Sequence, residues 1–177
     1  MVERTPVTRD PEVQALLDKQ AIGEVIARYS RTLDWLDDAG QASCYWPDAV
    51  IDYEFFKGTA AEFLPVVMTI ERASQRRWHM LSGLQIALTS ATTASTECYG
   101  MATGIREADG VFTGRLIGGR YLDEFERRAG VWRIAKRNYI MDWETPLGIQ
   151  NDGTPDPAFP LPVLKIVASG HPAYRPM

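Results

Sequence analysis

The sequence predicts an α+β protein in which a curved antiparallel sheet wraps around N-terminal helices and encloses one pocket. Two observations indicate this fold class. Apolar residues recur at helical spacing in the first third of the chain, and from residue 79 onward long strand-like runs are joined by short turns that contain glycine. Helices followed by a strand meander are typical of an α+β order, because parallel sheets need alternating units.

The first predicted helix begins near Asp10 and ends at the segment Asp37-Asp38-Ala39-Gly40. The segment Asp10-Pro11-Glu12 is a typical helix start, with a capping acid, a proline in the first turn and an acid near the positive end of the helix dipole. Turn-forming residues at 37–40 predict its end. Its apolar residues fall three and four positions apart, as one buried face requires: Ile22, Val25, Ile26, Tyr29, Leu33 and Leu36.

A strand and a second helix are predicted next. The run 49–56 is rich in β-formers and is expected to stop at Lys57-Gly58. Thr59 stands three residues before Glu62, which predicts a capping box. Pro65 is expected in the first turn of this helix, since deeper inside it would remove a hydrogen bond. The predicted apolar side is made of Phe63, Val66, Val67 and Ile70.

Four long strands are predicted over 80–88, 94–106, 111–126 and 131–142. The joints at 108–110 and 128–130 have the short glycine-containing form of antiparallel hairpins. Gly118-Gly119 lies inside the third strand, where glycine is typical of a bulge or a sharp bend.

The domain is expected to occupy residues 1–145, with a proline-rich C-terminal extension at 146–177. Prolines at 146, 155, 157, 160 and 162 disfavour regular structure, while apolar residues between 159 and 167 favour docking. The extension is therefore expected to pack on the domain or on a neighbouring subunit. The alternative is a lid over the mouth of the pocket.

Composition and charge exclude several classes of partner. The formal net charge is −4 with acids and bases interspersed, so no basic face for nucleic acid is predicted. No apolar run approaches the roughly 20 residues that span a bilayer, and the first five residues do not resemble a signal peptide. We expect a cytoplasmic protein that binds neither nucleic acid nor membrane.

No metal or cofactor is predicted either. His79 and His171 are far apart in sequence, and neither has a second histidine or clustered carboxylates nearby. No glycine-rich phosphate loop follows a strand. Cys44 and Cys98 match neither a disulfide framework nor a metal motif, so buried free thiols are expected.

Asp34, at the end of the first apolar stripe, and His79 are the candidate catalytic residues. A carboxylate and an imidazole suffice to move a proton at neutral pH without a metal or cofactor. Each also has an ordinary interpretation. Asp34 lies away from the centre of the apolar stripe and could be a solvated acid, and His79 could simply begin a strand.

The order and spacing of several motifs resemble the SnoaL-like branch of the NTF2-like superfamily, over roughly residues 12 to 145. These motifs are Tyr29-x-Arg31-x-Leu33-Asp34, Trp46-x-Asp48-Ala49, Ile51-Asp52-Tyr53, His79, and Gly118-Gly119-x-Tyr121 continuing through Trp132 to Arg137. The chain resembles three cofactor-independent lyases there: scytalone dehydratase, bile acid 7α-dehydratase and hexachlorocyclohexane dehydrochlorinase. The resemblance implies a cone-shaped fold with an Asp–His pair inside it.

The resemblance also implies roles for individual residues. Asp34 and His79 match the Asp–His pair, and Tyr29, Tyr53 and Arg137 match a further set of active-site residues. The chain departs from these relatives in three ways. The dehydrochlorinase has a lysine at the position of Tyr29, a further aspartate of the bile acid enzyme is matched by Ala102, and the second histidine of the scytalone enzyme has no counterpart.

Three of these residues also have structural interpretations. Tyr29 lies on the buried helix face and could be core, and Tyr53 could be pocket wall. Arg137 could stabilise a developing oxyanion, or it could pair with Asp123 or Glu126 on the sheet.

The predicted function is a cofactor-free lyase, most simply a dehydratase, that acts on a hydrophobic aromatic or polycyclic hydroxylated small molecule. Breakdown of aromatic compounds is the setting in which such substrates arise. The alternatives are a retro-aldol lyase that releases formaldehyde from lignin-derived diaryl compounds, an isomerase of the ketosteroid type, and a ligand-binding cone without catalysis. The resemblance further implies a homo-oligomer, with a trimer favoured over a dimer.

Overall fold

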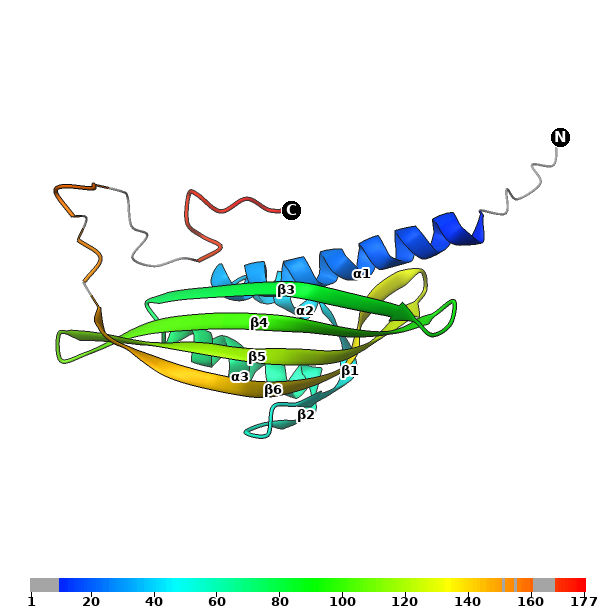
Figure 1. Cartoon of the computed structure of the whole chain (residues 1–177), viewed down its shortest axis with the longest axis horizontal. Helices are drawn as coiled ribbons and strands as arrows, with labels where there is room; N and C mark the ends of the chain where they lie inside the picture. Colours follow the sequence, from blue (N-terminus) through cyan, green and yellow to red (C-terminus); the bar gives the residue numbers. More distant parts are fainter. Residues whose placement is uncertain (1–9, 151, 155, 161–167) are drawn as a thin grey trace.

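The structure is a computed structural model that describes residues 10–150, 152–154, 156–160 and 168–177. It is an α+β fold in which a curved six-stranded sheet, which does not close, packs against helices from the first half of the chain (Figure 1), as predicted. The sheet order is β2-β1-β6-β5-β4-β3. The elements are α1 Pro11–Asp34, α2 Asp38–Ala42, β1 Tyr45–Asp52, β2 Lys57–Thr59, α3 Ala60–Arg72, β3 Arg76–Leu88, β4 Thr93–Ala108, β5 Val111–Arg128 and β6 Val131–Gln150.

Helix α1 starts as predicted and ends earlier than predicted. The Asp10 side chain accepts a hydrogen bond from the Glu12 N–H at 2.8 Å, which caps the first turn. The helix ends at Asp34 rather than at residues 37–40, because Leu36 adopts a φ of 51° that a helix cannot continue. The apolar stripe is buried from Ile22 to Leu33. Asp34 is thereby the last helical residue, held at the end of a buried stripe.

The predicted stop at Lys57-Gly58 is wrong, and so is the predicted position of Pro65. The chain turns at Glu54, whose φ is 59°, and β2 pairs antiparallel with β1. The capping box of α3 forms between Thr59 and Glu62, as predicted. Pro65 is the sixth residue of α3 and therefore lies beyond its first turn. Of the predicted apolar side, Phe63 and Val67 are buried whereas Val66 and Ile70 are each 38% exposed.

The sheet is mixed rather than wholly antiparallel. Strands β3 to β6 form an antiparallel meander, but β1 pairs parallel to β6, with Ile51 opposite Arg137. Strand β6 also runs further than predicted and continues through Pro146. The strand tolerates this proline because β1 pairs with β6 only as far as Asn138, so one edge of β6 is unpaired beyond that point. The expected boundary at residue 145 thus falls inside a strand.

Two hairpin turns and one bulge form where glycine predicted them. Asp109-Gly110 and Ala129-Gly130 have positive φ at both central residues, which is the conformation of the tight turn that matches strand twist. The register of β5 against β6 shifts between Gly118 and Gly119. A Cβ atom at Gly118 would lie 2.3 Å from the Trp143 ring, so the indole packs directly over Gly118 and leaves no room for a side chain there.

A buried polar cluster around Asp18 joins the first half of helix α1 to the sheet. Asp18 accepts a hydrogen bond from the Trp132 indole N–H at 2.9 Å and one from Arg127 at 3.3 Å.

Cys44 and Cys98 are buried free thiols, as predicted. Within the part of the chain that the structure describes, no helix is long and apolar enough to cross a membrane.

The C-terminal residues 168–177 return to the end of α1 (Figure 1). The Tyr174 hydroxyl donates to Asp37 at 2.6 Å, and its ring lies 5.6 Å from that of Trp35 and under the Arg31 guanidinium at 4.8 Å. The tail thus contacts α1 only three residues from Asp34. The apolar run at 161–167, expected to dock, lies outside the described residues.

Candidate active site

A cavity of about 1150 Å³ lies between the helices and the sheet. That volume is ample for a polycyclic small molecule. Its wall is contributed by α1, α3, the turn after β1 and the long strands. Among the lining residues are Tyr29, Leu33, Tyr53, Phe63, Val67, Glu71, His79, Ala102, Ile117, Tyr121, Asn138 and Tyr139.

Asp34 and His79 form a pair at this cavity. His79 Nδ1 lies 2.7 Å from Asp34 Oδ1, and the backbone N–H of His79 donates to Asp34 Oδ2 at 3.1 Å. Two hydrogen bonds to one carboxylate fix both the imidazole ring and the backbone of β3 at His79, so Nδ1 carries the proton that Asp34 accepts. The Nε2 atom is left for the cavity, which His79 lines.

The protonation of His79 is set by three neighbours. Burial and the charge of Arg77 lower the imidazole pKa, but the hydrogen bond that His79 donates to Asp34 and the charges of Glu71 and Asp34 outweigh them, so the pKa of His79 is raised above its usual value. The side chain is only 9% exposed. A buried imidazole with a raised pKa is a stronger base once it has lost its proton.

Arg77 joins the two helix ends beside this pair. Its Nε donates to the Glu71 carbonyl at 2.8 Å, its Nη1 donates to the Asp34 carbonyl at 3.2 Å, and its Nη2 donates to the Ser74 carbonyl. The guanidinium therefore satisfies carbonyls at the C-terminal ends of both α1 and α3. These contacts hold Asp34 at a fixed distance from the strand that carries His79.

Glu71 is a second carboxyl group at His79 that sequence reasoning missed. Its Oε1 lies 3.7 Å from His79 Nε2, on the side of the ring away from Asp34. Burial raises the pKa of Glu71. A signal was available, because Phe63, Val67 and Glu71 are four residues apart and share the buried face of α3.

Two tyrosines meet at another part of the cavity wall. The hydroxyls of Tyr29 and Tyr53 lie 3.1 Å apart, and the Tyr53 ring stacks between Phe63 and Tyr139. Burial raises the pKa of both hydroxyls, so both stay protonated and can donate a hydrogen bond. Both tyrosines thus line the cavity and also offer a hydroxyl that can donate a hydrogen bond.

Arg137 is placed beneath the cavity rather than in its wall. It is fully buried and pairs with Asp123 through Nε at 2.8 Å and Nη2 at 2.6 Å, while Nη1 donates to the Tyr45 hydroxyl at 3.0 Å. The cavity lining formed by the described residues does not include Arg137. The partner is Asp123, one of the two acids considered from sequence, and direct contact with a substrate is not supported.

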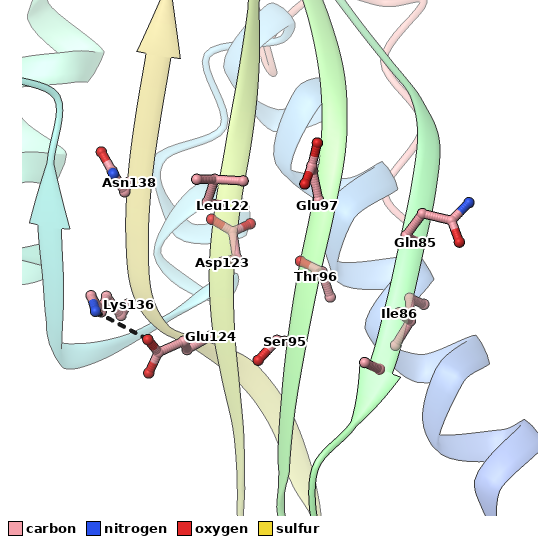
Figure 2. A pocket seen from close by; sticks show the side chains of 11 residues that line it. Gln85, Ile86, Ser95, Thr96, Glu97, Leu122, Asp123, Glu124, Lys136 and Asn138 are labelled. Atoms are coloured by element: carbon pink, nitrogen blue, oxygen red, sulfur yellow. Dashed lines mark hydrogen bonds and ion pairs between the residues drawn. The ribbon is translucent and has the colours of Figure 1, made fainter.

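A second hollow, of about 570 Å³, lies on the sheet over β3 to β6 (Figure 2). Its side chains include Gln85, Glu97 and Leu122, and its ion pair joins Lys136 to Glu124 at 3.0 Å. Both partners of this ion pair are more than half exposed. The hollow lacks a histidine, so we place the candidate site in the larger cavity.

The structure therefore brings four of the five predicted site residues to one cavity. Tyr29, Tyr53 and His79 line it, and Asp34 stands directly behind His79. The position of Ala102 is also informative, because this residue lines the cavity opposite His79 in the β3–β4 register without offering a functional group.

The SnoaL-like domain family matches residues 14–138 of this chain, which span both halves of the Asp–His pair. The chain belongs to the SnoaL-like family. Among curated proteins, none matches the sequence significantly.

Solved structures of SnoaL-like and NTF2-like proteins share the fold. A type 2 hexachlorocyclohexane dehydrochlorinase is 22% identical, with a TM-score of 0.69, and the match covers 77% of this chain and 93% of that one. A putative scytalone dehydratase from Novosphingobium aromaticivorans is 20% identical, with a TM-score of 0.68 over 78% and 93% of the two chains. A type 3 dehydrochlorinase from Novosphingobium barchaimii is 23% identical, with a TM-score of 0.68 over 77% and 94%. At these identities the likeness shows the fold, and these neighbours are lyase-type enzymes.

Proposed function

We propose that this SnoaL-like protein is a cofactor-independent lyase that removes water from a hydrophobic, aromatic or polycyclic hydroxylated molecule. The observation that carries the proposal is the Asp34–His79 pair, with Nδ1 bound at 2.7 Å and Nε2 directed to a large cavity. His79 removes a proton from a carbon next to an activating carbonyl. Asp34 keeps the ring in the reactive tautomer and stabilises the imidazolium that forms.

The tyrosine pair supplies the hydrogen bonds for the activating group. Tyr29 and Tyr53 are protonated and share the cavity wall, so either hydroxyl can donate to a carbonyl oxygen that becomes negative. The walls around them are aromatic and aliphatic, which favours a flat apolar substrate.

Arg137 supports the tyrosines without touching the substrate. Its guanidinium carbon lies 4.1 Å from the Tyr29 ring centroid, and its positive charge lowers the pKa of Tyr29 and Tyr53 against the larger effect of burial. We therefore assign it a positioning role through the tyrosine rings.

The test uses purified protein and a panel of bicyclic aromatic β-hydroxy ketones and diaryl diols, with product mass as the readout. Loss of one water supports the proposal. Loss of formaldehyde identifies the retro-aldol alternative, and a new product with the mass of the substrate identifies an isomerase.

Substitutions of Asp34 and His79 test whether an observed activity depends on this pair. His79→Ala and Asp34→Asn are expected to lower kcat by about 10²- to 10⁴-fold. Asp38→Asn, which removes a carboxylate that is 62% exposed on the next helix, is the matched control and should change little. Activity that survives in both pair variants would contradict the mechanism. Ligand affinity that is unchanged in both variants, without any turnover, would indicate a binding cone.

A homo-oligomer, with a trimer favoured, is also part of the proposal. Trp78, Met80 and Tyr99 are between 41% and 51% exposed, and the β3–β4 register puts them on one face of the sheet, which supports a contact between copies there. Light scattering on the eluting protein measures the mass. A monomer at micromolar concentration would contradict this part.

A further inference from the structure

Glu71 occupies a position that the Asp34–His79 pair leaves open. Asp34 holds Nδ1, so Nε2 is the ring nitrogen that can reach a substrate, and Glu71 Oε1 lies 3.7 Å from that nitrogen. Glu71 lines the cavity, with 14% of its side chain exposed. A substrate held beside Nε2 would therefore also lie beside this carboxyl group.

The distance between Glu71 and His79 leaves both groups available. A hydrogen bond between a carboxyl oxygen and a ring nitrogen is about 2.7–3.2 Å long, so 3.7 Å places the two groups next to each other without joining them. They face the same part of the cavity from α3 and β3. This arrangement suits two proton transfers on one side of a substrate.

We propose that Glu71 is the general acid of this site: it protonates the leaving hydroxyl while His79 removes the proton from the neighbouring carbon. The assignment rests on the proposed dehydratase function and specifies which group expels the water. The geometry implies that the hydrogen and the hydroxyl leave from the same face of the substrate.

The step balances without another reactant. The C–H bond breaks and its electron pair forms the new C=C bond, and the C–O bond breaks with its electrons on oxygen. That oxygen takes the proton of Glu71 and leaves as water, while His79 keeps the carbon-bound proton. Transfer of this proton from Nε2 to the adjacent Glu71 carboxylate restores both groups for the next turnover.

The electrostatic surroundings support an acid at this position. Burial is the dominant effect and raises the pKa of Glu71. The charged groups that face it are His79 and Arg77 from β3, Arg106 from β4 and Asp34 from α1; the three basic groups lower its pKa, and Asp34 raises it. Because the charge of Glu71 in turn raises the pKa of His79, the two groups titrate as a coupled pair.

The first experiment tests the pair without any substrate. The His79 imidazole is titrated by NMR in the wild type, in Glu71→Gln and in Glu97→Gln, a control on an exposed position of β4. We expect a lower His79 pKa in E71Q, because the carboxylate that forms when Glu71 gives up its proton is no longer there to stabilise the imidazolium, and the wild-type value in E97Q. An unchanged His79 pKa in E71Q overturns the proposal. If E71Q does not fold, Glu71→Asp keeps the charge, and the same comparison is made between E71D and Glu71→Ser.

The second experiment separates the acid from the base. A tetralone β-hydroxy ketone and its β-chloro analogue are compared, because chloride leaves without a proton. Glu71→Gln is expected to lower kcat on the alcohol by about 10²-fold and on the chloride by less than about 10-fold, whereas His79→Ala lowers both. Equal losses on the two compounds in E71Q overturn the acid role. If the wild type turns over neither compound, the dehydratase function fails for this skeleton, and the titration alone decides whether Glu71 and His79 form a pair.

Discussion

The guanidinium of Arg137 lies under the ring of Tyr29, with 4.1 Å between its central carbon and the ring centroid. The same group lies 4.5 Å from the Tyr121 centroid and is held by two hydrogen bonds to Asp123. A fully buried ion pair thus forms the support on which the aromatic wall of the cavity rests. Because the charges of Arg137 and Asp123 compensate each other, the cavity wall above them can be apolar.

Removal of Arg137 should destabilise the protein far more than removal of its neighbour. Arg137→Met leaves Asp123 buried without its partner, and we expect the free energy of unfolding to fall by roughly 3–5 kcal/mol. Lys136→Met is the control, since its ion pair is exposed and should contribute less than about 1 kcal/mol. Urea denaturation of both variants measures the difference. Equal losses of unfolding free energy in the two variants would show that the buried ion pair stabilises the fold no more than the exposed one.

The hydroxyls of Tyr29 and Tyr53 should behave as one unit. Tyr29→Phe and Tyr53→Phe each leave one partner of the 3.1 Å contact, and each is expected to cost about 1 kcal/mol of unfolding free energy. The double variant should cost clearly less than the sum, because the second change removes a group already unpaired. Tyr99→Phe, on a half-exposed side chain, is the control. Strict additivity in denaturant titrations would contradict a coupled pair.

Stability should depend on pH through His79. Its pKa is raised in the folded state, so its contribution is fully present below the unfolded value of about 6.5 and is lost as pH rises through the folded pKa. We expect the difference in unfolding free energy between the wild type and His79→Gln to shrink as pH rises across that window. The raised pKa of Glu71 acts in the same direction from a lower starting pH, so Glu71→Gln serves as the comparison. A difference that stays constant from pH 6 to 9 would count against the raised pKa.

A substitution in the hairpin turn between β5 and β6 should raise the stability of the protein. Ala129 has a φ of 51°, a conformation that alanine adopts at a cost and asparagine tolerates. Ala129→Asn is therefore expected to raise the free energy of unfolding by about 0.5–1 kcal/mol, seen as a higher melting temperature in calorimetry. Ala108→Asn is the control, since it tests the same change at the end of a β-strand. A lower melting temperature in the first variant would contradict the turn assignment.

Local signals in the sequence predicted much of the fold, and non-local ones were missed. Asp10-Pro11, Thr59 with Glu62, and the glycines at 110 and 130 act within a few residues, so their caps and turns were predicted correctly. The parallel pairing of β1 with β6 depends on contacts about 90 residues apart and was missed. The end of α1 at Asp34 follows from the φ of Leu36, which periodicity does not reveal.

The candidate site, like the fold, was predicted from the sequence only in part. Residues 34 and 79 were singled out by their chemistry and by family resemblance, and the structure brings their atoms to 2.7 Å. Glu71 was missed because a lone acid near a helix end is usually solvated, although its spacing from Phe63 and Val67 puts it on the inner face. The environment of Arg137 was left open because strand parity alone does not show how a bulged sheet curves.

The parallel pairing of β1 with β6 has a consequence for how the chain folds during synthesis. Tyr45 and Ile51 leave the ribosome early, but the strand that lies beside them is the last of the sheet to be made. Until β6 emerges, Asp123 lacks Arg137 and β1 has an open edge. The nascent domain therefore completes its core in one late, long-range step, and a chain stopped at residue 128 would expose both an unpaired acid and a strand edge prone to wrong pairing.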